Sequence, residues 1–152
     1  MIVPQGWFLP VAPGTQFVTL GGAIDNYVHC KNHHVTGSFG CHVRAFELLR
    51  SDGNRLLCTP EQNTEWFQAT VGGLGLTGLI TWVEIQLQRI ANPWIVAENR
   101  RFAHLDAFLA LDADYEAPYP YIVSWTDCAA TVRALGRGIS MAGVHAPSLL
   151  PI

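Results

Sequence analysis

FVTLGGAIDNYVHCKNHHVTGSFG, residues 17–40, is the most informative part of this 152-residue chain. It starts with a short apolar run, residues 17–20, which predicts a strand. Paired glycines follow at 21 and 22, where a backbone can come very close to another backbone or to a flat ligand. Three histidines and one lysine then lie within residues 29–34. This combination predicts a ligand site with titratable groups, and the alternative is an ordinary loop with solvated histidines.

Composition limits the function classes that the chain can belong to. Charged residues make up 14% and hydrophobic residues 49%, which is typical of a well-buried chain or of a piece of a larger body. The net charge of -3 and the lack of a Lys/Arg cluster give no reason to expect a nucleic-acid partner. No apolar run approaches the roughly 20 residues that span a bilayer. The N-terminus lacks the features of a signal peptide, so we expect a cytoplasmic protein with four free cysteines.

Local patterns predict an α+β fold rather than alternating βαβ units. Strands are expected at 43–50 and 55–58, joined by a hairpin turn at 51–54, and at 79–90, where apolar and polar residues alternate. A helix is expected to open at Thr59 as N-cap with Pro60 at its first position, and to stop at 72–73. Further along, the patterns predict strands at 94–97, 121–125 and 138–141 and a helix at 102–111.

Two motifs suggest other ligands. Residues 73–78 fit GxGxxG, but a helix is predicted before them and a strand after them, which inverts the context of a dinucleotide-binding fingerprint. His29 and His33 have the spacing of one zinc-ligand pair, yet no second pair follows. We therefore assign no metal ligands and expect no nicotinamide cofactor.

Several stretches together resemble a known family. Residues 13–24, the run His29-x-Lys31-Asn32-His33-His34 and residues 37–40 are similar to FAD-linked oxidases of the vanillyl-alcohol-oxidase superfamily, which have a PCMH-type FAD-binding domain. Residues 69–80 and 121–127 agree in order and spacing. The similarity is greatest to the decaprenylphosphoryl-ribose 2'-oxidase-like branch, and it covers most of the chain.

The resemblance implies a domain organisation and a cofactor. Residues 1–92 would be the C-terminal part of the PCMH-type FAD-binding domain, its second subdomain, and residues 93–152 the truncated beginning of an α+β substrate (cap) domain. Proteins of this family are much longer, and their pyrophosphate loop lies in a first subdomain. The chain would therefore be an internal fragment, whose expected partners are the missing N- and C-terminal parts of the same protein. The implied cofactor is FAD.

The resemblance also places the site residue by residue. The catalytic residues that it implies are His29 and Lys31, which would orient the substrate and balance charge at the flavin. The cofactor contacts would be Gly14, Thr19, Leu20, Gly21, Gly22, Asn26, Tyr27, Val28, His29 and Ile80.

Three positions depart from the family pattern. Cys30 stands where glycine is usual, and Asp25 stands where a small residue is common. Val123 replaces a small polar residue, which puts sugar-type hydrogen bonding at that point in doubt.

The sequence thus predicts part of an FAD-dependent oxidoreductase that oxidises an alcohol carbon (CH–OH) of a sugar or polyol-like substrate by hydride transfer to the flavin. Alone, this fragment would be inactive. Two alternatives remain open: a small zinc- or ligand-binding module, and a truncated product without activity.

Overall fold

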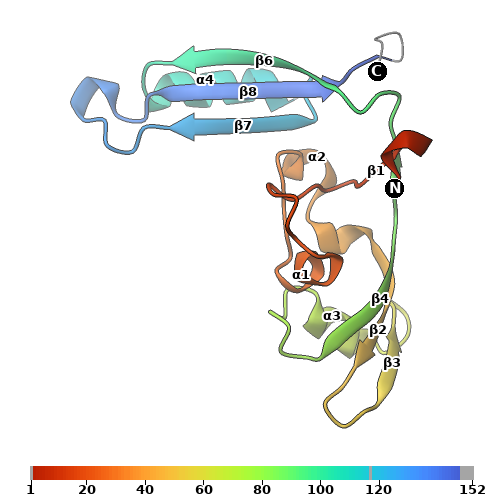
Figure 1. Cartoon of the computed structure of the whole chain (residues 1–152). Helices are drawn as coiled ribbons and strands as arrows, with labels where there is room; N and C mark the ends of the chain where they lie inside the picture. The colour runs from red at the N-terminus through yellow and green to blue at the C-terminus, as the bar shows by residue number, and fades with distance from the viewer. Residues whose placement is uncertain (1, 117, 148–152) are drawn as a thin grey trace. The chain divides into compact units, whose positions relative to one another are not determined.

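The chain divides into two compact units, each with its own antiparallel sheets and helices (Figure 1). A computed structural model describes residues 2–116 and 118–147. The first unit is residues 7–89, and the second unit combines residues 2–6 with the described residues from 90 onward. The predicted α+β class is confirmed at the level of mixed helices and antiparallel sheets.

The first unit is built around a three-stranded sheet. Its strand order is β3-β2-β4, and a separate two-stranded pair joins β1 to β5. The elements of this unit are β1 (Trp7–Phe8), α1 (Leu20–Asp25), α2 (His33–Thr36), η2 (Phe39–His42), β2 (Val43–Leu49), β3 (Arg55–Cys58), α3 (Thr64–Thr70), β4 (Leu79–Ile85) and β5 (Gln88–Arg89).

The core of the first unit lies between the sheet and helices α1 and α3. Phe46 of β2 is completely buried, and it pairs in register with Cys58 of β3 and Val83 of β4. Its ring stacks on that of Phe67 from α3 at a centroid distance of 5.2 Å. Ile24 of α1 is buried in the same cluster. Alternate residues of a strand point to the same face of the sheet. Helices α1 and α3 therefore both pack on the face that carries Phe46.

The predicted hairpin is confirmed. The Arg50 N–H donates to the Asn54 carbonyl at 2.9 Å, and Gly53 has a φ of 85°. The Asp52 carboxylate accepts the Asn54 N–H, also at 2.9 Å. A left-handed glycine and a local Asp–Asn bond are the features that such tight turns require.

The predicted strand at 17–20 is wrong. Thr19 is instead the N-cap of helix α1, and its hydroxyl accepts the Gly22 N–H at 3.0 Å. Phe17 is 84% exposed and pairs with no strand. An apolar run of this kind suits a strand, but the hydroxyl of a threonine can also accept one of the free N–H groups at the start of a helix.

Two other boundaries also differ from prediction. Helix α3 begins at Thr64, because the Thr59 hydroxyl accepts the Glu61 and Gln62 N–H groups within a tight turn rather than at a helix start. The long strand predicted at 79–90 is divided: β4 ends at Ile85, and Gln88–Arg89 pair with β1. The Arg89 guanidinium lies over the Trp7 ring at 4.0 Å, which helps hold that second pairing.

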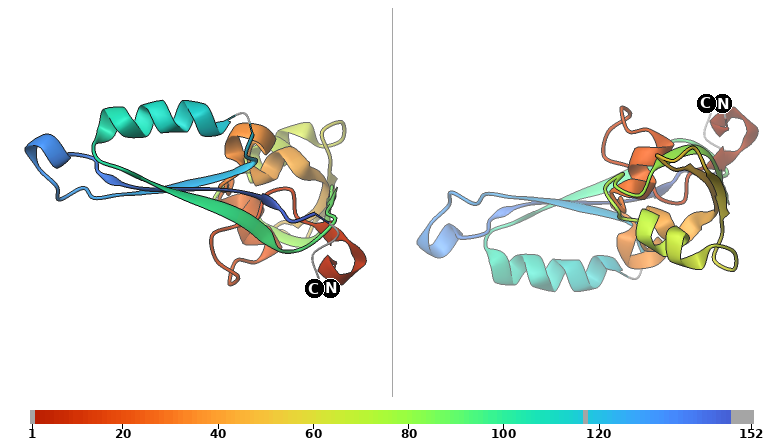
Figure 2. Two further views of the ribbon diagram at one scale, coloured as in Figure 1. Left: turned by 90° about the horizontal axis from the view of Figure 1, so that it is seen from above. Right: turned by 90° about the horizontal axis from the view of Figure 1, so that it is seen from below.

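The second unit is a three-stranded sheet of order β6-β8-β7 with one helix along a face (Figure 2). Its elements are η1 (Val3–Gln5), β6 (Ile95–Phe102), α4 (Leu105–Glu116), β7 (Tyr121–Thr126), η3 (Val132–Ala134) and β8 (Gly138–His145). Contacts from Arg100 to the Tyr115 ring and from Phe102 to Phe108 fix which sheet face carries α4. Since strand residues alternate between faces, Trp125, which is 68% exposed, lies on the opposite face.

The helix predicted at 102–111 is shifted. Phe102 is the last residue of β6 and is buried, and α4 begins only at Leu105. Leu105 and Leu109 are largely exposed. The strands predicted at 94–97, 121–125 and 138–141 all exist, in longer form.

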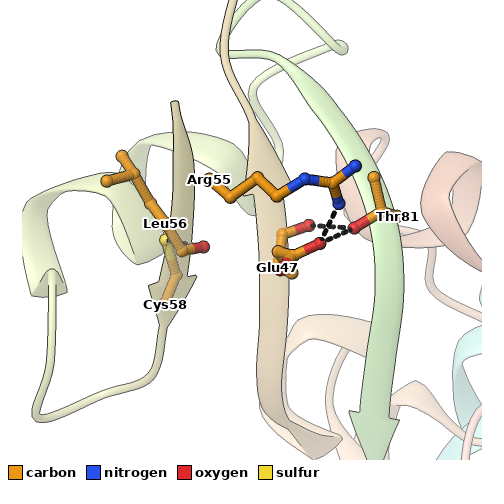
Figure 3. A network of polar contacts seen from close by, with 5 residues as sticks. All are labelled: Glu47, Arg55, Leu56, Cys58 and Thr81. Atoms are coloured by element: carbon orange, nitrogen blue, oxygen red, sulfur yellow. Dashed lines mark hydrogen bonds and ion pairs between the residues drawn. The ribbon is translucent and has the colours of Figure 1, made fainter. Parts of the chain in front are cut away.

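A polar network ties the three strands of the first sheet together on its outer face (Figure 3). The Glu47 carboxylate of β2 accepts the Thr81 hydroxyl of β4 at 2.6 Å and pairs with the Arg55 guanidinium of β3, also at 2.6 Å. The Thr81 hydrogen bond, followed by the Arg55 hydrogen bond, holds the pKa of Glu47 below its ordinary value. The ionised form of Glu47 therefore joins both neighbouring strands.

This network predicts a defined pH dependence. A carboxylate whose pKa is lowered in the folded state contributes stability above the unfolded pKa, near 4.3, and loses it as pH falls through the folded pKa. Thermal unfolding between pH 7 and pH 3 should therefore show a smaller pH-dependent loss in Glu47→Gln than in the unmodified chain. Thr81→Val should remove part of the same dependence. An unchanged pH profile in Glu47→Gln would contradict the role given to this network.

Candidate functional site

A hollow of about 420 Å³ opens in the first unit beside helix α1. Its lining is largely apolar and contains no charged residue. Three of the predicted cofactor contacts, Gly14, Thr19 and Leu20, belong to it. The lining residues are Phe8, Leu9, Ala12, Pro13, Gly14, Thr15, Gln16, Val18, Thr19, Leu20, Ala23 and Phe39.

One side of helix α1 lines the hollow, and another side faces strand β4 of the sheet. Thr19, Leu20 and Ala23 lie on the side of the helix that lines the hollow. Gly21 lies on another side, where an added Cβ would be 3.8 Å from the Ile80 Cβ of β4. The predicted contacts Gly21 and Ile80 are therefore neighbours in space, although 59 positions separate them in the sequence.

The segment after α1 folds back on the helix. The Asn26 side-chain amide donates to the Gly22 carbonyl at 2.8 Å, and the Val28 N–H donates to the Ala23 carbonyl at 3.0 Å. Tyr27 between them has a left-handed φ of 48°, which is uncommon for a residue with a side chain. An added Cβ at Gly40 would lie 2.7 Å from the Tyr27 ring, so glycine is required there.

The Tyr27 hydroxyl approaches the thiol of Cys41 at 3.9 Å. Its hydrogen bond with Cys41, followed by the charge of that group and by burial, raises the pKa of Tyr27. Tyr27 and Cys41 are both exposed residues of the first unit. The phenol therefore stays neutral in the range where most enzymes work.

His29 and Lys31 are presented on an exposed loop. The His29 ring lies 5.5 Å from the His33 ring in an edge-on arrangement, and Lys31 is exposed. Between them, Cys30 packs partly against the core, and its carbonyl accepts the His33 N–H at 3.1 Å. Neither His29 nor Lys31 lines the 420 Å³ hollow, and neither do Gly21, Gly22, Asn26, Tyr27, Val28 or Ile80. The assignment of these residues to a cofactor stays a prediction.

Zinc-type ligation finds no geometric support in the part of the chain that the structure describes. Within residues 2–116 and 118–147, no group of three or more His, Cys, Asp or Glu side chains comes together to hold a metal ion. The cysteines at 30, 41, 58 and 128 are free thiols. Among the same described residues, no helix is both long and apolar enough to cross a bilayer.

The glycine-rich turn at 72–78 docks on α1. Helix α3 precedes it and strand β4 follows it, as predicted. The Gly72 N–H donates to the Ile24 carbonyl at 3.0 Å, and the Leu74 N–H donates to the Asp25 carbonyl at 2.9 Å. The glycines therefore serve close backbone approach to α1, which brings Ile80 next to Gly21.

Two polar residues of this region were not predicted as site components. Asp25, at the end of α1, has one carboxylate oxygen buried without a hydrogen-bond partner among the described residues, and desolvation raises its pKa. Asn32 is 2% exposed and donates from its side chain to the Pro10 carbonyl at 2.6 Å. Asn32 belongs to the motif that carries the resemblance, but nothing in the sequence indicates that its side chain is buried.

The chain is similar to known proteins over most of its length. A Streptomyces coelicolor protein, named as an uncharacterised protein in the mprA 5' region, is 40% identical over 97% of this chain and 40% of its own length. Decaprenylphosphoryl-beta-D-ribose oxidase of Mycolicibacterium smegmatis is 42% identical over 89% of this chain and 30% of its own. Human Delta(24)-sterol reductase is 34% identical over 57% of this chain and 17% of its own length.

The chain thus spans well under half the length of these curated relatives. No protein-family profile matches it. The two relatives that carry enzyme names are FAD-dependent oxidoreductases.

Proposed function

Because the chain belongs to the vanillyl-alcohol-oxidase superfamily, the oxidoreductases with a PCMH-type FAD-binding domain, we propose that residues 7–89 form part of an FAD site. The observation that carries this proposal is the apolar hollow beside α1, which Gly14, Thr19 and Leu20 line. The resemblance alone had placed cofactor contacts at these three positions. Their convergence on one hollow supports the assignment from a second direction.

The residues of the hollow fit the flat aromatic part of a flavin. Phe8, Leu9 and Phe39 offer apolar surface, and a Cβ at Gly14 would meet nothing within 4 Å, so the backbone there leaves open space. Flat ligands are bound mainly by such apolar walls, with a few polar groups that fix orientation. Thr15, Gln16 and Thr19 are the polar side chains in the lining.

The proposed reaction is oxidation of an alcohol carbon on a sugar or polyol-like substrate. The name of the mycobacterial relative, which contains a ribose, favours a sugar. A bound flavin supplies the acceptor for the hydride that leaves the alcohol carbon. In this proposal, Lys31 provides positive charge near the ring, and His29 donates or accepts a hydrogen bond at the substrate hydroxyl. Both side chains are exposed, which leaves them free to contact a ligand.

The second unit supplies the beginning of the substrate-binding domain in this proposal. The sheet face opposite α4 carries Val123 and Trp125 on β7 and Met141 on β8. Strand β6 places Asn99 and Arg101 on the same face, so this face combines apolar surface with hydrogen-bond donors. This face therefore suits a substrate with an apolar portion beside its hydroxyl group.

Flavin titration tests the proposed site directly. The hollow has no charged lining residue, so the pyrophosphate of FAD finds no cation there. We expect the purified chain to quench flavin fluorescence weakly, with riboflavin and FAD bound within about threefold of each other, or about 0.7 kcal/mol. NAD⁺ serves as the control and should not compete.

The outcomes separate cleanly. Absence of binding of either flavin at millimolar concentration would refute the hollow as a ring site. FAD bound much more tightly than riboflavin would show that other residues hold the pyrophosphate, and the ring would not be the main anchor.

A further inference from the structure

Asn32 is a buried residue inside an exposed loop. It is 2% exposed, while Lys31 before it and His33 after it are exposed. Asparagine is seldom this deeply buried unless its amide makes hydrogen bonds. The contacts of Asn32 therefore decide how the loop that carries His29 and Lys31 is held.

The side-chain amide of Asn32 joins this loop to the wall of the hollow. Its Nδ2 donates to the Pro10 carbonyl at 2.6 Å in a buried hydrogen bond. The group facing Pro10 must be the NH₂, because a carbonyl oxygen can only accept. Pro10 is followed by Val11, which is completely buried in the core. Leu9, directly before Pro10, and Ala12, two positions after it, line the hollow.

The backbone of Asn32 holds the other side of the loop. Its carbonyl accepts the Val35 and Thr36 N–H groups at 3.0 and 2.9 Å, and also the Thr36 hydroxyl at 3.0 Å. These bonds start helix α2 directly after the loop. One residue is thus bonded to α2 through its backbone and to the wall of the hollow through its side chain.

Packing alone does not account for an amide at this position. The Oδ1 of Asn32 is buried and has no hydrogen-bond partner among the described residues. A buried acceptor without a partner is destabilising, and an aliphatic side chain would fill similar space without that cost. The NH₂ group and its bond to Pro10 are what the amide adds.

We propose that Asn32 is a positioning residue of the flavin site: its amide, bonded to the Pro10 carbonyl, sets where the loop holds His29 and Lys31 relative to the hollow. The inference rests on the proposed function for the identity of the ligand. We call the bond from the Asn32 amide to the Pro10 carbonyl the tether, and it rests on the hydrogen bonds of Asn32 in the structure. Its loss displaces Lys31 and His29 without removing either side chain.

Asn32→Asp gives a variant that can be switched by pH. Aspartate has nearly the same shape, but its ionised carboxylate repels the Pro10 carbonyl at pH 8. At pH 5 a buried carboxyl, whose pKa rises well above about 3.9, is protonated and can donate its O–H to that carbonyl. At pH 8 we expect Asn32→Asp to bind riboflavin at least about tenfold more weakly than the unmodified chain does. At pH 5 the two affinities should agree within about twofold.

A second readout needs no flavin. Cys30 lies two positions before Asn32 and is partly buried, whereas Cys41 is exposed and serves as an internal reference. Thiol alkylation followed by peptide mass spectrometry gives the ratio of the Cys30 rate to the Cys41 rate. In Asn32→Asp this ratio should rise about tenfold over the unmodified chain at pH 8 and recover at pH 5.

Two controls separate positioning from general destabilisation. Asn63 also donates its amide to a backbone carbonyl, that of Leu57 at 2.8 Å, but it is exposed. Asn63→Asp should change neither readout. Leu48→Val creates a cavity in the buried sheet and should lower thermal stability while leaving flavin affinity unchanged. If Asn32→Asp does not fold at pH 8, Asn32→Ser, which keeps a hydroxyl donor, should show an intermediate loss of affinity.

Three results would contradict the role given to Asn32. A pH-independent Cys30 ratio in Asn32→Asp overturns the tether. Unchanged flavin affinity at pH 8 overturns the positioning role, and so does an equal loss of affinity in Leu48→Val. If the unmodified chain binds no flavin, the proposed function and the positioning role both fail, and the Cys30 ratio still decides whether Asn32 sets the loop.

Discussion

Gly14→Leu should weaken riboflavin binding at least about tenfold, or about 1.4 kcal/mol, while stability stays within about 0.5 kcal/mol. Gly14 lines the hollow, and a Cβ there would meet nothing within 4 Å. The Cβ of a leucine therefore meets no obstacle, and because Gly14 lines the hollow we expect the side chain to take space that the ligand needs. Fluorescence titration measures the affinity, and thermal unfolding measures the stability.

A graded series at Gly14 strengthens this test. Alanine, valine and leucine should weaken binding progressively, because each occupies more of the same space. Phe17→Ala is the control, since Phe17 is 84% exposed and does not line the hollow. Equal affinity across the series at Gly14 would mean that the flavin binds elsewhere on the chain.

Phe46→Ala should lower the free energy of unfolding of the first unit by about 3–5 kcal/mol. Phe46 is completely buried on the middle strand of the sheet, and its ring stacks on Phe67. Truncation leaves a cavity between β2 and α3, and the surrounding strands cannot close it without breaking their register. Urea unfolding followed by tryptophan fluorescence measures the loss.

Leu57→Ala provides the comparison for Phe46→Ala. Leu57 lies on the neighbouring strand β3 and is 40% exposed, so its truncation should cost less than about 1 kcal/mol. Similar losses for the two variants would show that Phe46 is not at the centre of this core.

Residues whose structure depends on near neighbours were predicted well from the sequence. The hairpin at 51–54 follows from Asp52 and Gly53, which bond or bend the backbone locally. The alternation of Val83 and Ile85 with Glu84 predicted strand β4, because one face of the sheet is buried. The strands of the second unit were found from short apolar runs in the same way.

Predictions failed where two local solutions compete. The apolar run at 17–20 suits a strand, but the Thr19 hydroxyl caps a helix once Ala23 and Ile24 can be buried against the sheet. Thr59 has the chemistry of an N-cap and uses it in a turn, so α3 begins five residues later. The difference in free energy between such alternatives is set by tertiary packing, which local pattern does not contain.

The candidate site shows the same division. From the sequence alone, residues 13–40 and 69–80 could be matched to the family motifs, and glycines could be expected where backbones or ligands approach closely. Three contacts could be seen only in the folded chain: Gly21 lies next to Ile80, the glycine turn at 72–78 bonds to α1, and the Asn32 amide donates to the Pro10 carbonyl. These contacts join segments at least 22 positions apart. They depend on how the buried faces of α1 and the sheet pack, because burial of apolar surface is non-directional and selects partners only through the whole fold.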